Sequence, residues 1–354
     1  MKALSENFIV AAIGRATITD VASRSGVSIA TVSRVVNNPG AVRPDTEERV
    51  RRAMEELEYV PNGAGRSLAG GRAGNIGVLL LTPGDAARED AFFLEMLRGL
   101  ETAVEHAEVG IVISMRAASE SADAPLPRPI TRGRVDGLVV IGGPQPARYE
   151  EEIGRLGVPV VALSPDARGP AIWSVTADSR RGSEQAVTHL IGLGRRRIAH
   201  VGGPTANRTS ARKLEGYQLA LARHGITPDP ALHVVEPALH TREGGRVAVE
   251  RLLADGVVFD ALYASDDLVA LGALAALQAH GRAVPSDVAL VGYGDLEVAR
   301  ASDPALSTVH VNFRHQGWLA GNILLAAVQG RAPTPIQVNL ETRLVVRATS
   351  MGAA

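Results

Sequence analysis

The 354-residue sequence contains no cysteine. This absence excludes disulfide bonds and thiolate metal ligands, and it suits a reducing compartment. No apolar run approaches the ~20 residues that a membrane-spanning helix needs. The apolar run FIVAAI at residues 8–13 is too short for a secretory signal and lacks a convincing cleavage site. We therefore expect a cytoplasmic protein without a membrane partner.

The sequence also lacks the motifs of common enzyme classes. None of the nine histidines forms an H-E-x-x-H motif or an i, i+4 pair, so no zinc site is predicted. The run GRSLA at residues 65–69 lacks the preceding strand and the final glycine of a nucleophile elbow. No glycine-rich phosphate loop follows a strand-like run. We therefore expect no catalytic residue, metal or cofactor.

Neither sign of charge dominates the chain, whose net charge is −1. Residues 1–72 contain ten Lys and Arg and eight Asp and Glu, which gives +2 and leaves −3 for the remainder. This asymmetry is a weak sign of nucleic-acid binding at the amino-terminal end. The hydrophobic content of 45% is that of a globular protein, and the length allows two or three domains.

Residues 16–38 have the pattern of two short helices joined by a tight turn. Thr17 and Asp20 can form a capping box at the first helix. Gly26 suits a left-handed turn, and Ser28 can cap the second helix. Valines at helical spacing supply an inner face. The pattern predicts a helix-turn-helix, although two helices inside an ordinary core could look similar.

The outer face of the second helix is expected to enter the DNA major groove. Arg34 is the residue expected to read a base, because arginine can bind O6 and N7 of guanine together. A phosphate contact is the alternative for Arg34. Ile29 and Ala30 can offer only apolar contacts, for example with a thymine methyl group. Ser33 lies on the same face.

A third helix and a linker follow the helix-turn-helix. Pro44 suits a first helical turn, and Glu47 and Glu48 favour its positive end. Pro61 would stop this helix. The linker then runs over residues 62–69, before a pair of glycines.

Three motifs together resemble one family of regulators. They are TVSRVVN at residues 31–37, YVPN at residues 59–62 and SLAG at residues 67–70. In this order they resemble the amino-terminal region of the lactose-repressor (LacI/GalR) family of bacterial transcription regulators. The resemblance extends over residues 16–346.

The resemblance implies a mode of DNA binding. Two protomers would bind a near-palindromic operator with a CG step at its centre. In the family, paired linker helices occupy the minor groove, and Leu68 matches the leucine that wedges into the central step. Gly63 and Gly65 disfavour a linker helix, so we expect it to fold only on DNA. Further positions are expected to contact DNA, although several of them could serve only as helix caps. They are Thr17, Ser28, Thr31, Ser33, Asn37, Thr46 and Asn62.

From residue 75 onward, short β-rich runs alternate with helical stretches. This spacing favours parallel sheets joined by right-handed crossovers. The alternation restarts after Asp178, so two similar α/β halves are expected. The resemblance implies a bilobed periplasmic-binding-protein-like core of two Rossmann-like lobes. Its ligand cleft would lie at the carboxyl ends of the strands.

These patterns predict a helix-turn-helix domain at residues 16–60, a linker at 61–73 and an effector-binding core at 74–350. The first lobe is expected to comprise about residues 74–172 and 310–330, and the second lobe residues 176–306 and 334–350. Within the first lobe, residues 116–134 depart from the family, which usually has a helix there. Three prolines forbid a regular helix interior, so we expect a short loop. A harmless deletion and a partner site are the two explanations.

The resemblance also implies ligand contacts. Lys213 lies where an arginine commonly holds a sugar or carboxylate oxygen, and Asp266 where an asparagine or aspartate binds hydroxyl groups. Gly294 replaces a common acidic residue, which argues against a simple sugar. Asp295, the residue after this glycine, is a further match. Phe92 and Phe93 match an aromatic pair at the rim of the first lobe. Each residue could instead have a structural role.

The sequence thus predicts a homodimeric, DNA-binding transcriptional regulator. We expect a repressor whose operator affinity responds to a small polar, sugar-like effector. The chain has no carboxy-terminal heptads that would predict a tetramer. One alternative is a regulator whose cleft is vestigial or that responds to a protein partner. A solute-binding protein is disfavoured by the helix-turn-helix and the missing export signal, and an enzyme by the missing catalytic motifs.

Overall fold

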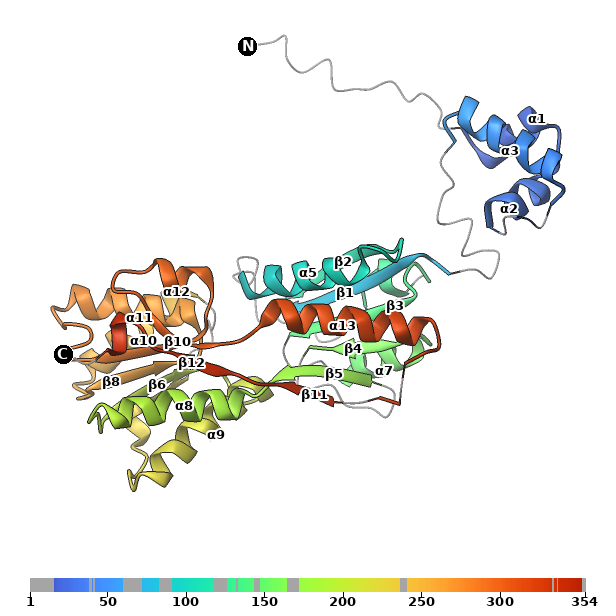
Figure 1. Ribbon diagram of the computed structural model, residues 1–354. Coiled ribbons are helices and arrows are strands. Elements are labelled where there is room, and N and C mark those ends of the chain that lie inside the picture. The colour runs from blue at the N-terminus through green and yellow to red at the C-terminus, as the bar shows by residue number, and fades with distance from the viewer. Residues whose placement is uncertain are drawn as a thin grey trace, which may run out of the picture. The chain divides into compact units, whose positions relative to one another are not determined.

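The computed structural model describes residues 16–37, 40, 42–59, 72–82, 91–117, 126–131, 133–142, 147–163, 172–235, 241–332, 334–335 and 337–351. The chain forms two compact units that divide between Ala73 and Gly74 (Figure 1). No helix in these described ranges is long and apolar enough to cross a membrane.

The first unit contains three helices, α1 (Ile18–Ser25), α2 (Ile29–Asn37) and α3 (Pro44–Glu56). The predicted capping box is confirmed, because Asp20 N–H donates to the Thr17 hydroxyl and Thr17 N–H donates to the Asp20 carboxylate. Gly26 has φ 67°, which confirms the left-handed turn. Val21, Val32 and Val50 are fully buried where the helices meet.

The second unit contains two six-stranded sheets. The first sheet is parallel, in the order β11 (Gln337–Leu340), β5 (Ile172–Ala177), β4 (Val160–Ala162), β3 (Gly137–Gly142), β1 (Asn75–Thr82) and β2 (Gly110–Ala117). The second has the order β12 (Arg343–Val345), β10 (Ser307–His310), β9 (Ala289–Gly294), β8 (Ala261–Ala264), β6 (Ile198–Gly202) and β7 (His233–Val235). Within it, β12 alone pairs antiparallel. The predicted α/β class is confirmed.

Helices cover both faces of each sheet. The first sheet packs on one face against α5 (Ala91–Val104) and α13 (Phe313–Val328), and on the other against α6 (Arg128–Thr131) and α7 (Ala147–Arg155). The second packs against α8 (Ser179–Gly192) and α9 (Arg208–Arg223), and on its other face against α10 (Arg242–Ala254), α11 (Asp267–Ala279) and α12 (Glu297–Ala301). Burial of both faces explains why the strands are almost continuously apolar.

The described chain passes between the two sheets three times, from β5 to α8, from β10 to α13 and from β11 to β12 (Figure 1). This corrects the assignment of residues 334–350 to the second lobe, because β11 pairs with β5 in the first sheet. β5 also belongs to the first lobe, because it pairs with β4, although the sequence did not predict a strand there. Glu341 and Thr342 separate β11 from β12, and a strand-like run does not reveal which sheet each part joins.

The proline-rich segment at residues 116–134 contains more structure than the predicted loop. Arg128–Thr131 form the four-residue helix α6. A proline in a first helical turn lacks only a donor that would be unpaired there, so Pro129 is tolerated. Leu126 and Ile130 are buried against the first sheet and hold α6 in place.

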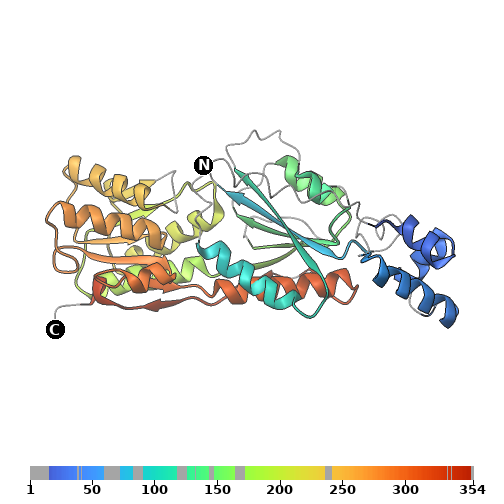
Figure 2. The ribbon, with the colours of Figure 1, turned by 90° about the horizontal axis from the view of Figure 1, so that it is seen from above.

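Glycines allow pairs of helices in the second unit to approach closely. α5 and α13 lie side by side (Figures 1 and 2), and a Cβ atom on Gly317 would lie 1.9 Å from the Met96 carbonyl oxygen. Between α10 and α11, a Cβ atom on Gly272 would lie 1.8 Å from the Arg242 carbonyl oxygen. Since these obstacles are backbone atoms, no side-chain rotation can relieve them.

We therefore expect Gly272→Ala to lower the free energy of unfolding by at least about 1–3 kcal/mol, as overpacked cores do. Gly154→Ala is the matched control, because Gly154 lies in α7 with no atom within 4 Å of an added Cβ. There, alanine should stabilise the protein by up to about 1 kcal/mol. Urea unfolding measures both changes, and equal effects of the two substitutions would contradict the close approach.

Candidate DNA-binding and ligand sites

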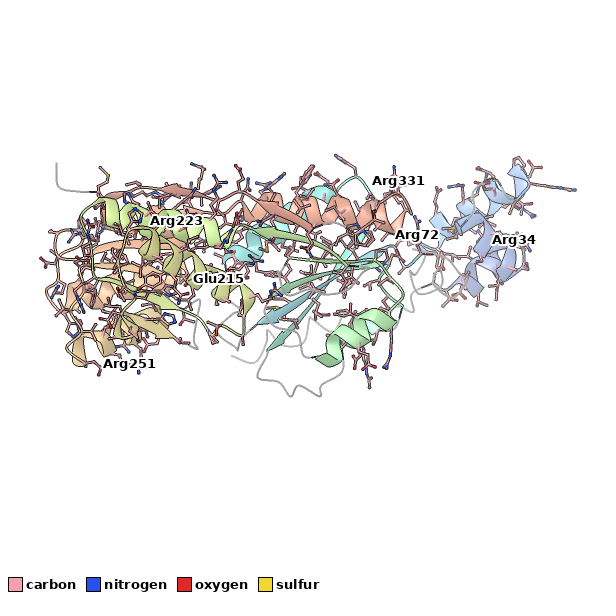
Figure 3. The ribbon with its side chains drawn as sticks, turned by 90° about the horizontal axis from the view of Figure 1, so that it is seen from below. Arg34, Arg72, Glu215, Arg223, Arg251 and Arg331 are labelled. Atoms are coloured by element: carbon pink, nitrogen blue, oxygen red, sulfur yellow. The ribbon has the colours of Figure 1, made fainter. Side chains whose placement is uncertain are left out.

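The outer face of α2 carries the side chains that the sequence predicted there. Ile29 is 48% exposed, and Ala30 and Arg34 are also exposed, whereas Val32 and Val35 are buried. Arg34 is labelled on α2 in Figure 3. An isoleucine with half its surface in water at the start of a helix has no role in the core of its own unit. The face is thus available to a partner.

Arg34 differs from neighbouring arginines in its charge partners. Arg24 pairs with Glu56 at 2.5 Å, and Arg51 pairs with Glu47 at 2.7 Å. No carboxylate among the described residues pairs with Arg34. Its guanidinium therefore keeps its five donors for another molecule.

The polar residues of the helix starts act as caps. The Thr31 N–H donates to the Ser28 hydroxyl at 3.1 Å, and the two hydroxyl groups are 2.9 Å apart. The Thr17 hydroxyl donates to the Asp20 carboxylate, which lowers the pKa of Asp20. Capping does not preclude a phosphate contact, because helix starts attract anions. Two further predicted DNA-binding positions, Ser33 of α2 and Thr46 of α3, are half-buried. The side chains of the other three lie outside the described residues, namely Asn37, Asn62 and Leu68.

At the carboxyl edge of the second sheet, Lys213 projects from α9 into the protein. Its ammonium donates to the Ser265 carbonyl oxygen at 2.6 Å and lies 3.9 Å above the centre of the Tyr293 ring. Lys213 is 6% exposed. Burial lowers its pKa to about 8, although Asp266 and Asp267 favour the charged form. The amine thus remains mostly protonated at neutral pH while sitting in a largely dry environment.

Asp266 and Asp267 follow β8 at the start of α11. Asp266 caps the helix by accepting from Leu268 N–H at 2.8 Å. Asp267, which the sequence analysis did not single out, is completely buried. It accepts from the Thr308 hydroxyl at 2.5 Å and from Leu296 N–H at 2.8 Å. Burial nevertheless raises its pKa to about 7. The sequence signal that could have identified Asp267 is a pair of consecutive acidic residues at the start of a helix.

Gly294 and Asp295 end β9 in unusual backbone conformations. Gly294 has φ 137°, and an added Cβ atom would lie 3.1 Å from Asp267 Oδ2. An acidic residue therefore could not replace this glycine without strain and charge repulsion. Asp295 binds His310 at 2.9 Å and Arg347 at 2.6 Å. These contacts give Asp295 a structural role at the carboxy-terminal segment, and a ligand contact at Asp295 stays a prediction.

The predicted aromatic pair differs in burial. Phe93 is buried in the core of the first sheet. Phe92 is half-buried, packs against the same core and lies beside Phe313, with ring centroids 5.7 Å apart. A ligand contact of either ring stays a prediction.

A helix-turn-helix unit with an exposed second helix, followed by a two-sheet α/β core, defines the class of ligand-responsive DNA-binding regulators. Comparisons with known proteins agree. The family of bacterial regulatory proteins, lacI family, matches residues 17–62, and the periplasmic binding protein-like domain matches residues 187–350. The HTH-type transcriptional regulator CelR of Thermobifida fusca is 31% identical over 335 residues, which cover 94% of this chain and 98% of that protein. Catabolite control protein A of Priestia megaterium is 31% identical, over 83% of this chain and 86% of that protein.

Two solved structures extend this similarity to the whole fold. A complex of the regulator CelR with cellobiose has a TM-score of 0.73 and 30% identity, covering 95% of this chain and 100% of that chain. A lac repressor dimer bound to operator and an anti-inducer has a TM-score of 0.77 and 27% identity, covering 95% and 99%. The chain belongs to the LacI family. It is a DNA-binding transcriptional regulator and not an enzyme, and the predicted fold and family are confirmed.

The buried Asp267 predicts a specific pH dependence. Its folded pKa of about 7 exceeds its ordinary value of 3.8, so the stability that it contributes is complete below about pH 4 and is lost as the pH rises through 7. Asp267→Asn resembles the protonated form and should remove this loss. We expect the free energy of unfolding of the variant, relative to the unaltered protein, to rise between about pH 5 and 8.

Urea unfolding at several pH values measures this difference, in which contributions from the other titrating groups cancel. Asp255→Asn is the control, because Asp255 is exposed at the end of α10. A constant difference between the Asp267→Asn variant and the unaltered protein across this range would show that Asp267 titrates normally.

Proposed function

We propose that the protein represses transcription in the cytoplasm by binding, as a homodimer, to a near-palindromic operator. The exposed face of α2 is the observation that carries this proposal. Its apolar residues Ile29 and Ala30 suit contacts with thymine methyl groups, and Arg34 suits a guanine. Two such helices related by a two-fold axis would read inverted half-sites. Leu68, outside the described residues, would wedge into a central CG step.

Arg34→Ala should weaken operator binding by roughly 1–3 kcal/mol and relax the preference at one base pair in each half-site. Selection of bound DNA from a random pool gives the preferred sequences, and fluorescence anisotropy gives the affinities. Arg52→Ala is the control, since Arg52 is exposed on α3 and pairs with Glu48 at 3.5 Å. It should leave the base preference unchanged. Selected sites without inverted symmetry would refute the dimeric mode of binding.

We further propose that a small, sugar-like effector binds at the carboxyl edge of the second sheet and alters operator affinity. The support is a buried cation, Lys213, at the same edge as the carboxylate of Asp266, whose charge favours the protonated form of Lys213. Among relatives, a CelR complex contains cellobiose. An effector can act only through its differential affinity for two arrangements of the protein. The expected mutual weakening of effector and operator binding is about 1–3 kcal/mol.

Thermal shift measurements with a panel of mono- and disaccharides, cellobiose included, test this site. We expect at least one sugar to raise the melting temperature, and Lys213→Met and Asp266→Asn to abolish the shift. Methionine preserves most of the buried volume of Lys213, and asparagine can still cap α11. A shift that survives both substitutions would place the effector elsewhere. A panel without any shift would favour a regulator whose cleft is vestigial or that responds to a protein partner.

A further inference from the structure

A row of polar side chains crosses the second sheet beneath Lys213. His233 of β7, His200 of β6 and Tyr263 of β8 are in register on three neighbouring strands. The His200 ring stacks on those of His233 and Tyr263, with centroids 5.0 and 5.2 Å apart. It also stacks at 5.0 Å on Tyr217 of α9. A core built from apolar strands does not require such a row.

His200 is held by two hydrogen bonds and is 1% exposed. Its Nδ1 lies 3.0 Å from Nδ1 of His233, and its Nε2 lies 3.0 Å from the Ser265 hydroxyl. An added Cβ atom on Gly202 would lie 2.6 Å from the His200 ring, so the backbone closes tightly over the imidazole. The ring therefore cannot rotate to choose other partners.

Ser265 joins this row to Lys213. Its backbone N–H donates to the Val201 carbonyl oxygen at 2.9 Å, while its own carbonyl oxygen accepts from the Lys213 ammonium at 2.6 Å. Its hydroxyl is the partner of His200. A single residue thus connects the histidine pair to the cation of the proposed effector site.

The geometry of the pair limits where protons can reside. Only one hydrogen fits between the two Nδ1 atoms, so one imidazole donates and the other accepts. In the neutral pair, either histidine can be the donor, and the Ser265 hydroxyl donates or accepts accordingly. In the pair that has taken up one further proton, both Nε2 atoms carry a hydrogen and one hydrogen lies between the two Nδ1 atoms. Nε2–H of His200 then donates to Ser265.

Burial makes the pair neutral at neutral pH. It lowers the pKa of His200 well below the ordinary value, and His233 and Lys213 lower it further. Burial also lowers the pKa of the half-buried His233, against the effect of its bond to His200. Other titratable or charged groups surround the pair and Lys213. On α9, β8 and β9 they are Tyr217, Tyr263 and Tyr293, and at the start of α11 they are Asp266 and Asp267. Asp229, in the turn before β7, pairs with Arg197, which precedes β6.

We propose that His200 and His233 are positioning residues for Lys213, and that uptake of one proton by this pair fixes the hydrogen bond from His200 to Ser265 in one direction and changes the charge around the Lys213 ammonium. Acidification would then change the effector site without any group of the pair touching the effector. The link to regulation rests on the proposed function of Lys213. The coupling between proton uptake by the histidine pair and the Lys213 ammonium does not depend on that proposed function.

The chain contains two lysines, Lys2 and Lys213, which permits a direct test. Lysine labelled with nitrogen-15 gives two side-chain ammonium signals, and Lys213→Arg identifies the one from Lys213. Lys213 itself titrates near pH 8 and Asp267 near pH 7, so the histidine pair is followed below that range. We expect an acid shift of that signal as the pH falls below about 6.5, the ordinary pKa of histidine, with the same midpoint as the Cε1 protons of His233. A Lys213 signal that does not move with the histidine pair in the unaltered protein would overturn the proposal.

Variants separate the pair from other histidines. His233→Asn can still donate a hydrogen bond to His200 but cannot titrate, so the acid shift of the Lys213 signal should disappear. His315→Asn removes a histidine of α13, stacked on Trp318, and should leave the shift intact. Persistence of the shift in His233→Asn would assign it to another group. If either variant changes its fold, its carbon–proton spectrum at pH 8 will differ from that of the unaltered protein. The proposal is then tested by the Lys213 signal of the unaltered protein alone.

The same proteins can be titrated with cellobiose above and below the midpoint of His233. If this sugar binds, its affinity should depend on pH in the unaltered protein and lose that dependence in His233→Asn. If it does not bind, cellobiose fails as the effector, while the Lys213 signal still confirms or refutes the histidine pair.

Discussion

The hydrogen bonds of Asp178 hold two crossing segments of the core together. Its N–H donates to the Leu340 carbonyl oxygen at 2.9 Å, and its carbonyl oxygen accepts from the Thr342 hydroxyl at 3.2 Å. Its side chain accepts from Arg181 N–H and starts α8. The residue that ends a strand of one sheet thus begins a helix of the other. At the passage from β10 to α13, Phe313 packs against the cores of both sheets.

The candidate ligand residues lie close to one of these crossings. Asp267 starts α11 beside Asp266, and it binds Thr308 of β10, the strand that leads into Phe313. Charged groups buried here interact strongly because little water screens them. A change of charge at Lys213 or Asp266 should therefore act on Asp267 and, through it, on Thr308 of β10. Such a connection is what a ligand-driven shift between two arrangements of the sheets requires.

The three described helices of the amino-terminal unit could be predicted from the sequence. Its signals are local: a capping box at Thr17, a left-handed turn at Gly26 and valines at helical spacing. Each depends on residues within four positions of one another, so tertiary context had little to change. The exposure of Ile29 and Arg34 followed directly, because burying one side of a short helix fixes the other. The alternating pattern of the core likewise determined its α/β class.

Only the tertiary structure decided how distant segments meet. The run at residues 337–345 looks like one strand, yet its halves join different sheets, because pairing with β5 and with β10 lies far away in sequence. The burial of Phe93 and the ion pairs of Asp295 likewise depend on segments far away in sequence. Asp267 carried no sequence signal of its perturbed pKa, since that depends on complete burial against β10. Local chemistry fixed the helices, turns and strands of this protein, whereas long-range packing and desolvation determined which charged groups became a site.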